Sequence, residues 1–156
     1  MKLDILLASV ATALVLASSP AISVVEPEPA DKLAAGNPDF AQGRRAVEAR
    51  DWKTAILSLT AADKRTANNA EIHNLLGFAY RNDGQLELAL KHYQRALQID
   101  SRHRGAHEYI GETYLLLNNP AKAEEHLAEL KRHCTSVCPE RDELAGKIAQ
   151  YRKSKG

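Results

Sequence analysis

The chain has 156 residues, a formal net charge of +1 and a charged fraction of 26%. This length suggests one modest domain, and the near-neutral balance gives no electrostatic attraction to nucleic acid or to an anionic membrane. Only 5% of the residues are aromatic, and a chain rich in Ala, Leu, Glu, Lys and Arg favours helix by propensity.

Residues 1–21 have the pattern of a secretory signal peptide, in which a positive charge precedes a short apolar run. The run extends from Ile5 to Ala17, and Ser19 and Ala21 are small residues that suit a signal peptidase. An uncleaved membrane anchor is the alternative, but the run is shorter than the ~20 residues that a spanning helix needs. We predict cleavage near Ala21, a periplasmic or secreted location, and no membrane contact after cleavage.

Residues 22–37 follow this segment and contain no hydrophobic period. Pro27 and Pro29 alternate with acidic residues, a composition typical of an unstructured connection. We interpret residues 22–37 as a flexible leader and assign them no structure.

An internal repeat begins after the leader. Gly43, Gly77 and Gly111 are spaced by 34 residues. Small residues at such positions allow two helices to approach closely, large residues fill the space between them, and a helix pair of this kind must stack on its neighbours to bury its apolar stripe. Three further series keep the same spacing: Ala55, Ala89 and Ala123; Leu59, Tyr93 and Leu127; Ala62, Ala96 and Leu130.

Six helices follow from this period, with turn or capping residues between them. Asp51 suits the start of the second helix and Pro120 the first turn of the sixth. Asn68-Asn69 and Asp100-Ser101 offer caps between the repeats. The expected helices are 38–50, 52–65, 69–82, 86–99, 103–117 and 120–133.

A seventh helix is expected near residues 139–153, after Pro139. Leu144, Ile148 and Tyr151 fall on one face at i, i+4 and i+7. A solenoid needs a final helix to cover its last apolar edge, so we interpret this segment as a cap.

The 34-residue unit resembles the tetratricopeptide repeat (TPR), most clearly where Leu76-Gly77 precedes Tyr80 and is followed by Ala89 and Tyr93. The resemblance implies an all-α fold: a right-handed superhelical solenoid of three TPR helix pairs with a C-terminal capping helix. It departs from the family where Asp39, His73 and His107 replace an early aromatic residue. The implied domains are three repeats within 38–135, at about 36–69, 70–103 and 104–137, and a capping helix at 138–154.

In this family the first helix of each repeat lines a concave groove that takes peptides or helices. The resemblance places positive charge (Arg44, Arg81) at one part of the groove and negative charge (Glu108, Glu112) at another, which suits a segment with an apolar anchor and charges of both signs. The pattern does not match the basic-and-amide clamp that reads a C-terminal carboxylate in chaperone cofactors. The implied groove residues are Phe40, Arg44, Asn74, Phe78, Arg81, Glu108, Glu112 and Leu115.

These observations predict a protein–protein interaction module of the cell envelope that needs no cofactor and is not an enzyme. The sequence contains no glycine-rich phosphate loop, nucleophile elbow or kinase signature. Glu108 and Glu112 lie one helical turn apart and could pass for paired catalytic carboxylates, but groove carboxylates more often bind or face water. The partner, a protein or peptide, is not identified by the sequence.

Cys134 and Cys138 are the two cysteines, and in an exported chain they suggest a disulfide. Regular helix keeps such Cβ atoms ~5–6 Å apart, whereas a disulfide needs about 3.8 Å, so the helix must end between them. In this pair the chain is similar to small exported bacterial TPR proteins. The alternatives are free or exchange-active thiols, or a zinc or copper site with His126 and His133, which would make this a metal-handling envelope protein.

Four of the six histidines recur with the repeat. His73 and His107 share one repeat position, and His92 and His126 share another. This recurrence favours a structural role over a ligand-binding one.

Overall fold

The computed structural model describes residues 36–155, and every regular element in this range is a helix. The all-α helical repeat fold expected from the sequence is confirmed, and each helix boundary lies within two residues of its prediction. The predicted signal peptide at 1–21, and the predicted leader up to residue 35, lie outside the described residues. The helices are α2 (Pro38–Glu48), α3 (Trp52–Arg65), α4 (Ala70–Asn82), α5 (Leu86–Ile99), α6 (Arg104–Leu116), α7 (Pro120–His133) and α8 (Pro139–Lys155).

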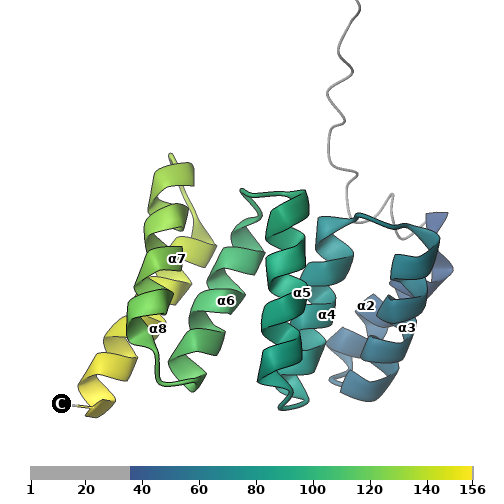
Figure 1. The fold of residues 1–156 in the computed structure, drawn as a ribbon, viewed down its shortest axis with the longest axis horizontal. Coiled ribbons are helices and arrows are strands. Elements are labelled where there is room, and N and C mark those ends of the chain that lie inside the picture. Colours follow the sequence, from purple (N-terminus) through teal and green to yellow (C-terminus); the bar gives the residue numbers. More distant parts are fainter. Residues whose placement is uncertain (1–35, 156) are drawn as a thin grey trace, which may run out of the picture.

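The helices lie side by side in chain order, from α2 and α3 at one end to α7 and α8 at the other (Figure 1). They pack as the pairs α2–α3, α4–α5 and α6–α7, and each pair packs on the next. The last helix, α8, packs against both α6 and α7. It therefore covers the end of the third pair. None of the described helices is long and apolar enough to cross a lipid bilayer.

Short polar side chains begin several helices where the sequence indicated caps. Oδ1 of Asp51 accepts a hydrogen bond from the Thr54 N–H, and the Asn69 side chain accepts one from the Ile72 N–H. Pro120 occupies the first turn of α7. Each contact satisfies an N–H group that has no partner within its own helix.

The start of α6 differs from the prediction. Neither Asp100 nor Ser101 caps this helix; Nδ1 of His103 accepts the hydrogen bond from the Ala106 N–H instead. The reason is that Asp100 ends α5, and its carboxylate accepts a hydrogen bond from the Arg102 N–H at 2.9 Å.

Residue 37 also departs from the prediction, which placed it in the flexible leader. Asn37 is 1% exposed and caps α2 through a hydrogen bond accepted from the Phe40 N–H. Its amide donates to the Ala62 carbonyl and to the Thr66 hydroxyl, both at 3.0 Å. Asn37 therefore ties the start of α2 to the end of α3. The sequence held a signal for this cap, because Asn37 directly precedes Pro38 at the start of a helix.

The recurring glycines mark the places where paired helices meet. A Cβ atom added to Gly43 would lie 2.6 Å from Leu59, and one added to Gly77 would lie 2.5 Å from the Tyr93 ring. Both distances are far below van der Waals contact. The absent side chains therefore make room for the large residue of the second helix, as the spacing predicted.

The third glycine has a different neighbour. The nearest atoms to a Cβ added to Gly111 belong to Leu144 of α8, at 2.6 Å, and not to Leu127 of its own pair. Leu127 instead joins Leu130, Leu144 and Ile148 in the terminal core cluster. The capping helix thus supplies the large side chain that fills the space beside this glycine.

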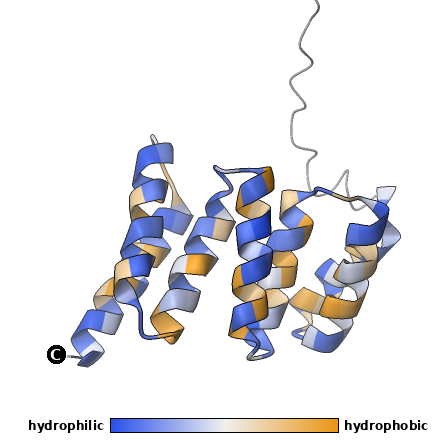
Figure 2. Ribbon diagram, viewed as in Figure 1, coloured by the Kyte–Doolittle hydropathy of each residue, from blue (hydrophilic) through white to orange (hydrophobic). Residues whose placement is uncertain are grey.

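The interior is built from residues on one face of each helix. Figure 2 shows both hydrophobic and hydrophilic residues on every helix. The largest fully buried side chain is Tyr93, followed by Phe40 and Leu59. In α8, Leu144 and Ile148 are buried, whereas the third residue of the predicted stripe, Tyr151, is only half-buried. Its hydroxyl donates a hydrogen bond to the Asn118 side chain.

Candidate functional site

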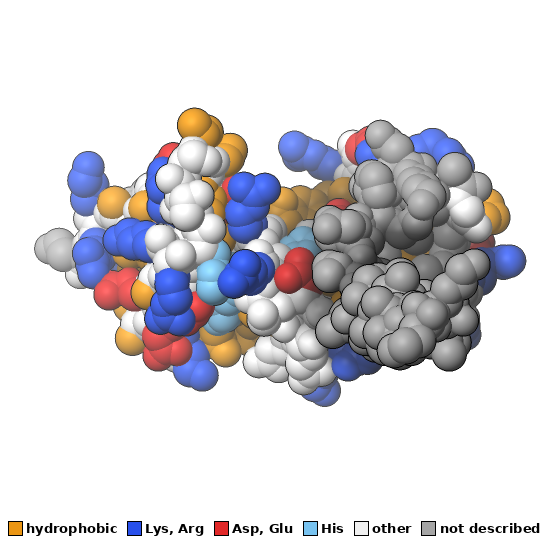
Figure 3. Space-filling model, turned by 90° about the horizontal axis from the view of Figure 1, so that it is seen from above, with side chains coloured by type: hydrophobic (Ala, Val, Ile, Leu, Met, Phe, Trp, Pro, Cys, Tyr) orange, Lys and Arg blue, Asp and Glu red, His pale blue; other side chains and the backbone are white. Residues whose placement is uncertain are grey.

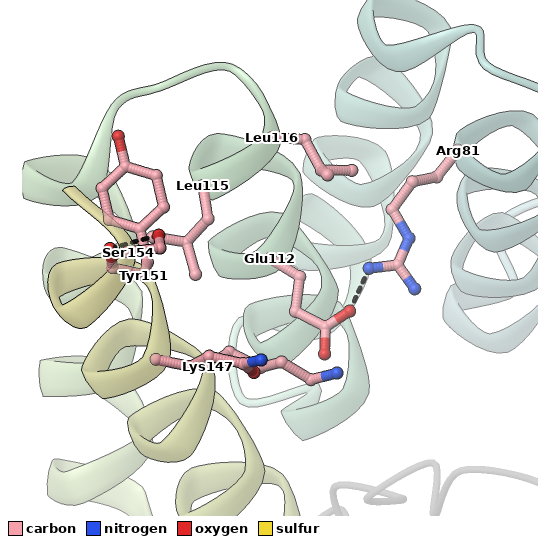
Figure 4. Close-up of a pocket in the computed structure, with 8 residues that line it drawn as sticks. Arg81, Glu112, Leu115, Leu116, Lys147, Tyr151 and Ser154 are labelled. Atoms are coloured by element: carbon pink, nitrogen blue, oxygen red, sulfur yellow. Dashed lines mark hydrogen bonds and ion pairs between the residues drawn. The ribbon is translucent and has the colours of Figure 1, made fainter.

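A cavity of about 330 Å³ opens between α4, α6 and α8. Figure 4 shows the side chains around it, with Glu112 pointing toward Arg81 and Leu115 lying near α8. Leu116 is 64% exposed, so a large apolar side chain stands in contact with solvent at this cavity. The wall is completed by α8. The lining includes Arg81, Glu112, Leu115, Leu116, Lys147 and Tyr151.

Arg81 is the most constrained charged group of this site. Its guanidinium forms an ion pair with the Glu112 carboxylate, and both side chains are nearly buried, at 12% and 14% exposure. The same guanidinium lies 5.3 Å from the centre of the Phe78 ring and 5.2 Å from that of Tyr109, within cation–π range. Three contacts thus hold it between α4 and α6.

This ion pair corrects the charge distribution expected from the sequence. Positive and negative groove residues were placed at separate parts of the groove, but Arg81 and Glu112 neutralise one another across the α4–α6 boundary. The pairing was hidden because their separation of 31 residues differs from the 34-residue period.

An aromatic row continues from the ion pair toward α3. The Phe78 ring lies 6.0 Å from Trp52 in an edge-on arrangement and 5.1 Å from Tyr109. Phe78 itself is half-buried. The row therefore places three half-buried aromatic side chains next to the ion pair, outside the lining of the cavity itself.

Three of the eight predicted groove residues, Arg81, Glu112 and Leu115, line the cavity, and the other five do not. Phe40 is 0% exposed and packs in the core cluster with Leu59 and Leu76, so the prediction that it lines the groove is corrected. It fails because the face of α2 that carries Phe40 is turned toward α3 and α4. Arg44 lines a separate hollow of about 200 Å³ with Arg45 and Glu48 of α2.

Asn74 is buried at 5% exposure, between α4 and the start of α6. Its Nδ2 donates to the Glu71 carboxylate at 3.4 Å, while its Oδ1 has no hydrogen-bond partner. A buried amide oxygen without a donor is uncommon and costs free energy.

Glu108 is half-buried and forms no hydrogen bond or ion pair with any described residue. Burial, followed by the neighbouring Glu112 carboxylate, raises the pKa of Glu108 to about 7. The Glu108 side chain is therefore expected to titrate near neutral pH.

The recurring histidines form two pairs, each across one helix hairpin. The Nδ1 atoms of His73 and His92 are 3.2 Å apart, and those of His107 and His126 are 2.9 Å apart. Burial, and then the partner histidine, lowers the pKa of His126 to about 4. Each pair is thus held together by a hydrogen bond between neutral rings. The sequence indicated the recurrence but not the pairing. Figure 3 shows histidine surface at two places among charges of both signs.

The two cysteine sulfur atoms lie 2.06 Å apart, which is bonding distance for a disulfide. As the sequence required, the helix ends between them, because α7 stops at His133 and α8 begins at Pro139. His126 and His133, the suggested metal ligands, contact His107 and Glu129 respectively. Within residues 36–155, no group of three or more His, Cys, Asp or Glu side chains could hold a metal ion.

Sequence reasoning missed part of the site. Tyr109 on α6 contacts Phe78 and Arg81, but it was not among the predicted groove residues. Lys147 and Tyr151 line the cavity although α8 was interpreted only as a cap. Nothing in the periodicity indicates them, since α8 stands outside the repeat.

Residues 70–103, which comprise α4 and α5, match the sequence model described as "Tetratricopeptide repeat". These are also the residues of the second predicted repeat. Human "Protein O-mannosyl-transferase TMTC3" is 33% identical over 89 residues, covering 57% of this chain and 10% of that protein. The chain therefore spans about a tenth of the length of this relative.

Solved TPR structures share the fold. The TPR2B domain of yeast Sti1, in a complex with pHsp70, superposes with a TM-score of 0.65 and 19% identity over 72% of this chain and 94% of that one. The first TPR of Spaghetti (RPAP3), bound to the HSP90 peptide SRMEEVD, has a TM-score of 0.66 and 12% identity over 83% and 97% of the two chains. Together with the match of residues 70–103, these structures support a relationship between this chain and the tetratricopeptide repeat family.

Proposed function

We propose that this protein is a protein–protein interaction module that binds a peptide or helical segment of a partner along the surface formed by α4, α6 and α8. One observation carries the proposal: the cavity of about 330 Å³ is bordered by the exposed Leu116 and by the Arg81–Glu112 ion pair. An apolar hollow with a few fixed polar groups is the usual form of a binding site. The peptide complexes of similar folds support this assignment.

The chemistry of the wall defines what the segment presents. An apolar side chain of the partner would pack against Leu115, Leu116 and Tyr151, and its burial supplies the driving force. Lys147 and the ion pair at the rim would fix the orientation of the segment. The proposal assigns no bond-making or bond-breaking step to these residues.

The place of action is part of the same proposal. The signal-peptide pattern of residues 1–21 and the cysteine pair support a periplasmic or secreted protein. The partner would then be another protein of the cell envelope or of the exterior.

Peptide display tests this function. A random-peptide library is selected on the purified protein, and the dissociation constant of the best peptide is measured by calorimetry. Leu116→Glu places a charge at the cavity, and we expect it to weaken binding at least ~10-fold. Leu57→Glu is the matched control, because Leu57 is 74% exposed on α3 and does not line the cavity.

The comparison of the two leucine variants decides the matter. Retained binding in Leu57→Glu and loss in Leu116→Glu support the groove. Equal affinities, with unchanged melting temperatures, would show that peptides bind elsewhere and would refute the proposed function.

A further inference from the structure

Helix α8 stands outside the three complete helix pairs, but two of its packing residues continue their spacing. Leu144 follows Ile110 by 34 residues, and Ala145 follows Gly111 by the same interval. Leu144 is fully buried, like Ile110, and Ala145 is the small residue that stands where each earlier unit has its glycine. In sequence, α8 therefore corresponds to the first helix of a fourth unit.

The direction of α8 agrees with this correspondence. Arg104 at the start of α6 pairs with Glu140 near the start of α8, and Tyr151 near the end of α8 bonds to Asn118 just beyond α6. The two helices are therefore parallel, as first helices of successive units must be. In each complete pair a second, antiparallel helix packs on the first. Among residues 36–155, α8 packs on α6 and α7 of the preceding pair and has no second helix of its own (Figure 1).

A hollow of about 290 Å³ lies between α7 and α8, beside the small residue that continues the glycine series. Leu127 and Ile148, 8% and 3% exposed, lie at its base, and Ala128, Ala145 and Ala149 complete its apolar surface. In the first two pairs, a large residue of the second helix fills the space beside the glycine. The α7–α8 hollow is thus the place where a second helix would pack on α8.

The charges of α8 are divided along its length. The part from Pro139 to Gly146 carries three acidic residues and one basic residue, whereas the part from Lys147 to Lys155 carries four basic residues and no acidic one. Two such helices attract one another when they lie antiparallel, because each acidic part then faces a basic part. In a parallel arrangement like charges would meet. A second copy of α8 therefore matches both the direction and the charge of the absent helix.

The register of such a pair follows from the residues around the hollow. Asp142, Ala145, Ala149 and Arg152 are spaced by three or four residues, so they share one face of α8. They also lie symmetrically about Lys147. Antiparallel copies that cross there place each Ala145 against Ala149 of the other copy, which permits a close approach, and each Asp142 opposite Arg152. The present ion pairs of Asp142 and Arg152 within the chain are exposed and therefore weak.

We propose that two copies of this protein associate through the α7–α8 hollow, with their α8 helices antiparallel across a two-fold axis. Each α8 then takes the place of the second helix that the other copy lacks. The proposal goes beyond the proposed function and does not depend on it, because Lys147 and Tyr151 line the cavity from another face of α8. One helix pair makes a small interface, so we expect a dissociation constant of about 10–100 µM.

Sedimentation velocity of the purified protein, from about 1 µM to about 500 µM, tests the association. We expect the average mass to rise from that of a monomer toward that of a dimer. Ala149→Glu places a charge in the hollow at an exposed position and should weaken the dimer at least ~10-fold. Thr60→Glu, exposed on α3, is the matched control and should leave the dimer unchanged, as should Leu116→Glu at the cavity.

Two charge reversals test the antiparallel register. Asp142→Arg and Arg152→Asp each place like charges opposite one another, and each should weaken its own dimer at least ~5-fold. An equimolar mixture of the two variants restores both opposite-charge pairs, so its dissociation constant should return to within ~2-fold of that of the unaltered protein. Reversals that leave the dimer as strong as before, or a mixture that stays as weak as each variant alone, would overturn the arrangement.

The alternative occupant of the hollow is a helix of another protein, and a synthetic peptide with the sequence of α7 serves as its probe. A protein that stays monomeric at every concentration would overturn the proposal. If that monomer bound the peptide, and Ala149→Glu abolished the binding, the hollow would belong to a helix of another protein. A dimer that Ala149→Glu leaves intact would form through another surface and would also overturn the proposal.

Discussion

The second and third helix pairs derive from the same repeat, yet they are completed in different ways. In the second pair, Gly77 faces Tyr93 of its own hairpin. In the third pair, Gly111 faces Leu144 of the capping helix. The second pair thus closes on itself, while the third needs a segment outside the repeat.

This difference explains where the candidate site lies. Because α8 packs on both α6 and α7, it adds a wall to the surface that α4 and α6 begin. Lys147 and Tyr151 join Arg81 and Glu112 around the cavity for that reason. The helix that covers the end of the solenoid also shapes the candidate site.

The largest effect should come from filling the glycine positions. Gly77→Val forces a branched side chain against the buried Tyr93 ring, and we expect the free energy of unfolding to fall by about 3 kcal/mol or more. Gly111→Val should cost about 1–2 kcal/mol, since it meets the tip of a leucine on a terminal helix that can shift. Urea unfolding measures both. Equal losses would contradict the distinction between the two pairs.

The contrast also shows what the sequence could predict. Helix boundaries followed from Gly43, Gly77 and Gly111 because packing within each hairpin repeats with the chain. The Arg81–Glu112 pair did not follow, since it joins neighbouring repeats at an offset unrelated to the period.

The sequence analysis was also wrong about which residues are buried. Phe40 was misplaced because the packing of α2 against α3 and α4, rather than any local pattern, decides which of its residues face inward. The position of α8 depends on docking in the same way, so Lys147 and Tyr151 could not be found from the repeat. Asn37 was misplaced for another reason, since the cap signal of Asn37-Pro38 is local and was overlooked.

Reduction of the disulfide should weaken the third pair selectively. Cys134 and Cys138 close a short loop that tethers α8 to α7, and such a loop contributes about 2 kcal/mol in the chain-entropy view. We expect Cys138→Ala to lower stability by about this amount and to increase hydrogen exchange in α8. The exchange of α4 and α5 should stay unchanged. Uniformly faster exchange would argue against a local role.

The histidine pairs make the stability of the second and third helix pairs depend on pH. The pKa of His126 is lowered to about 4 by burial and then by His107. The unfolded histidine titrates near ~6.5, so the unfolded state binds more protons between these values and stability falls as the pH drops from ~6.5 toward 4. Glu108 opposes this trend, because its raised pKa means that stability increases as the pH falls through about 7.

Glu108→Gln protein is therefore the background for this measurement. The free energy of unfolding of this variant should fall as the pH drops from ~6.5 toward 4. Adding His126→Gln should make this fall smaller by roughly 1 kcal/mol, after allowance for solvent screening. His92→Gln should reduce it less, because Asp63 lies 3.4 Å from Nε2 of His73 and favours a charge on that pair. If His92→Gln instead diminished the acid-induced loss of stability more than His126→Gln does, the expected order of the two histidine pairs would be wrong.

The smallest effect is a gain at a glycine without neighbours. Gly146 is exposed in α8, and a Cβ atom there would meet nothing within 4 Å. Gly146→Ala should raise stability by about 0.5–1 kcal/mol through helix propensity alone. Thermal unfolding measures this gain, and a loss would mean that α8 approaches another element more closely than described.

Hydrogen exchange with and without a display-selected peptide tests the central claim most directly. If the segment lies along the surface of α4, α6 and α8, the peptide should slow exchange in these three helices and leave α3 and α5 unchanged. Slower exchange only in α3 and α5, the second helices of the first two pairs, would contradict binding at the surface of α4, α6 and α8.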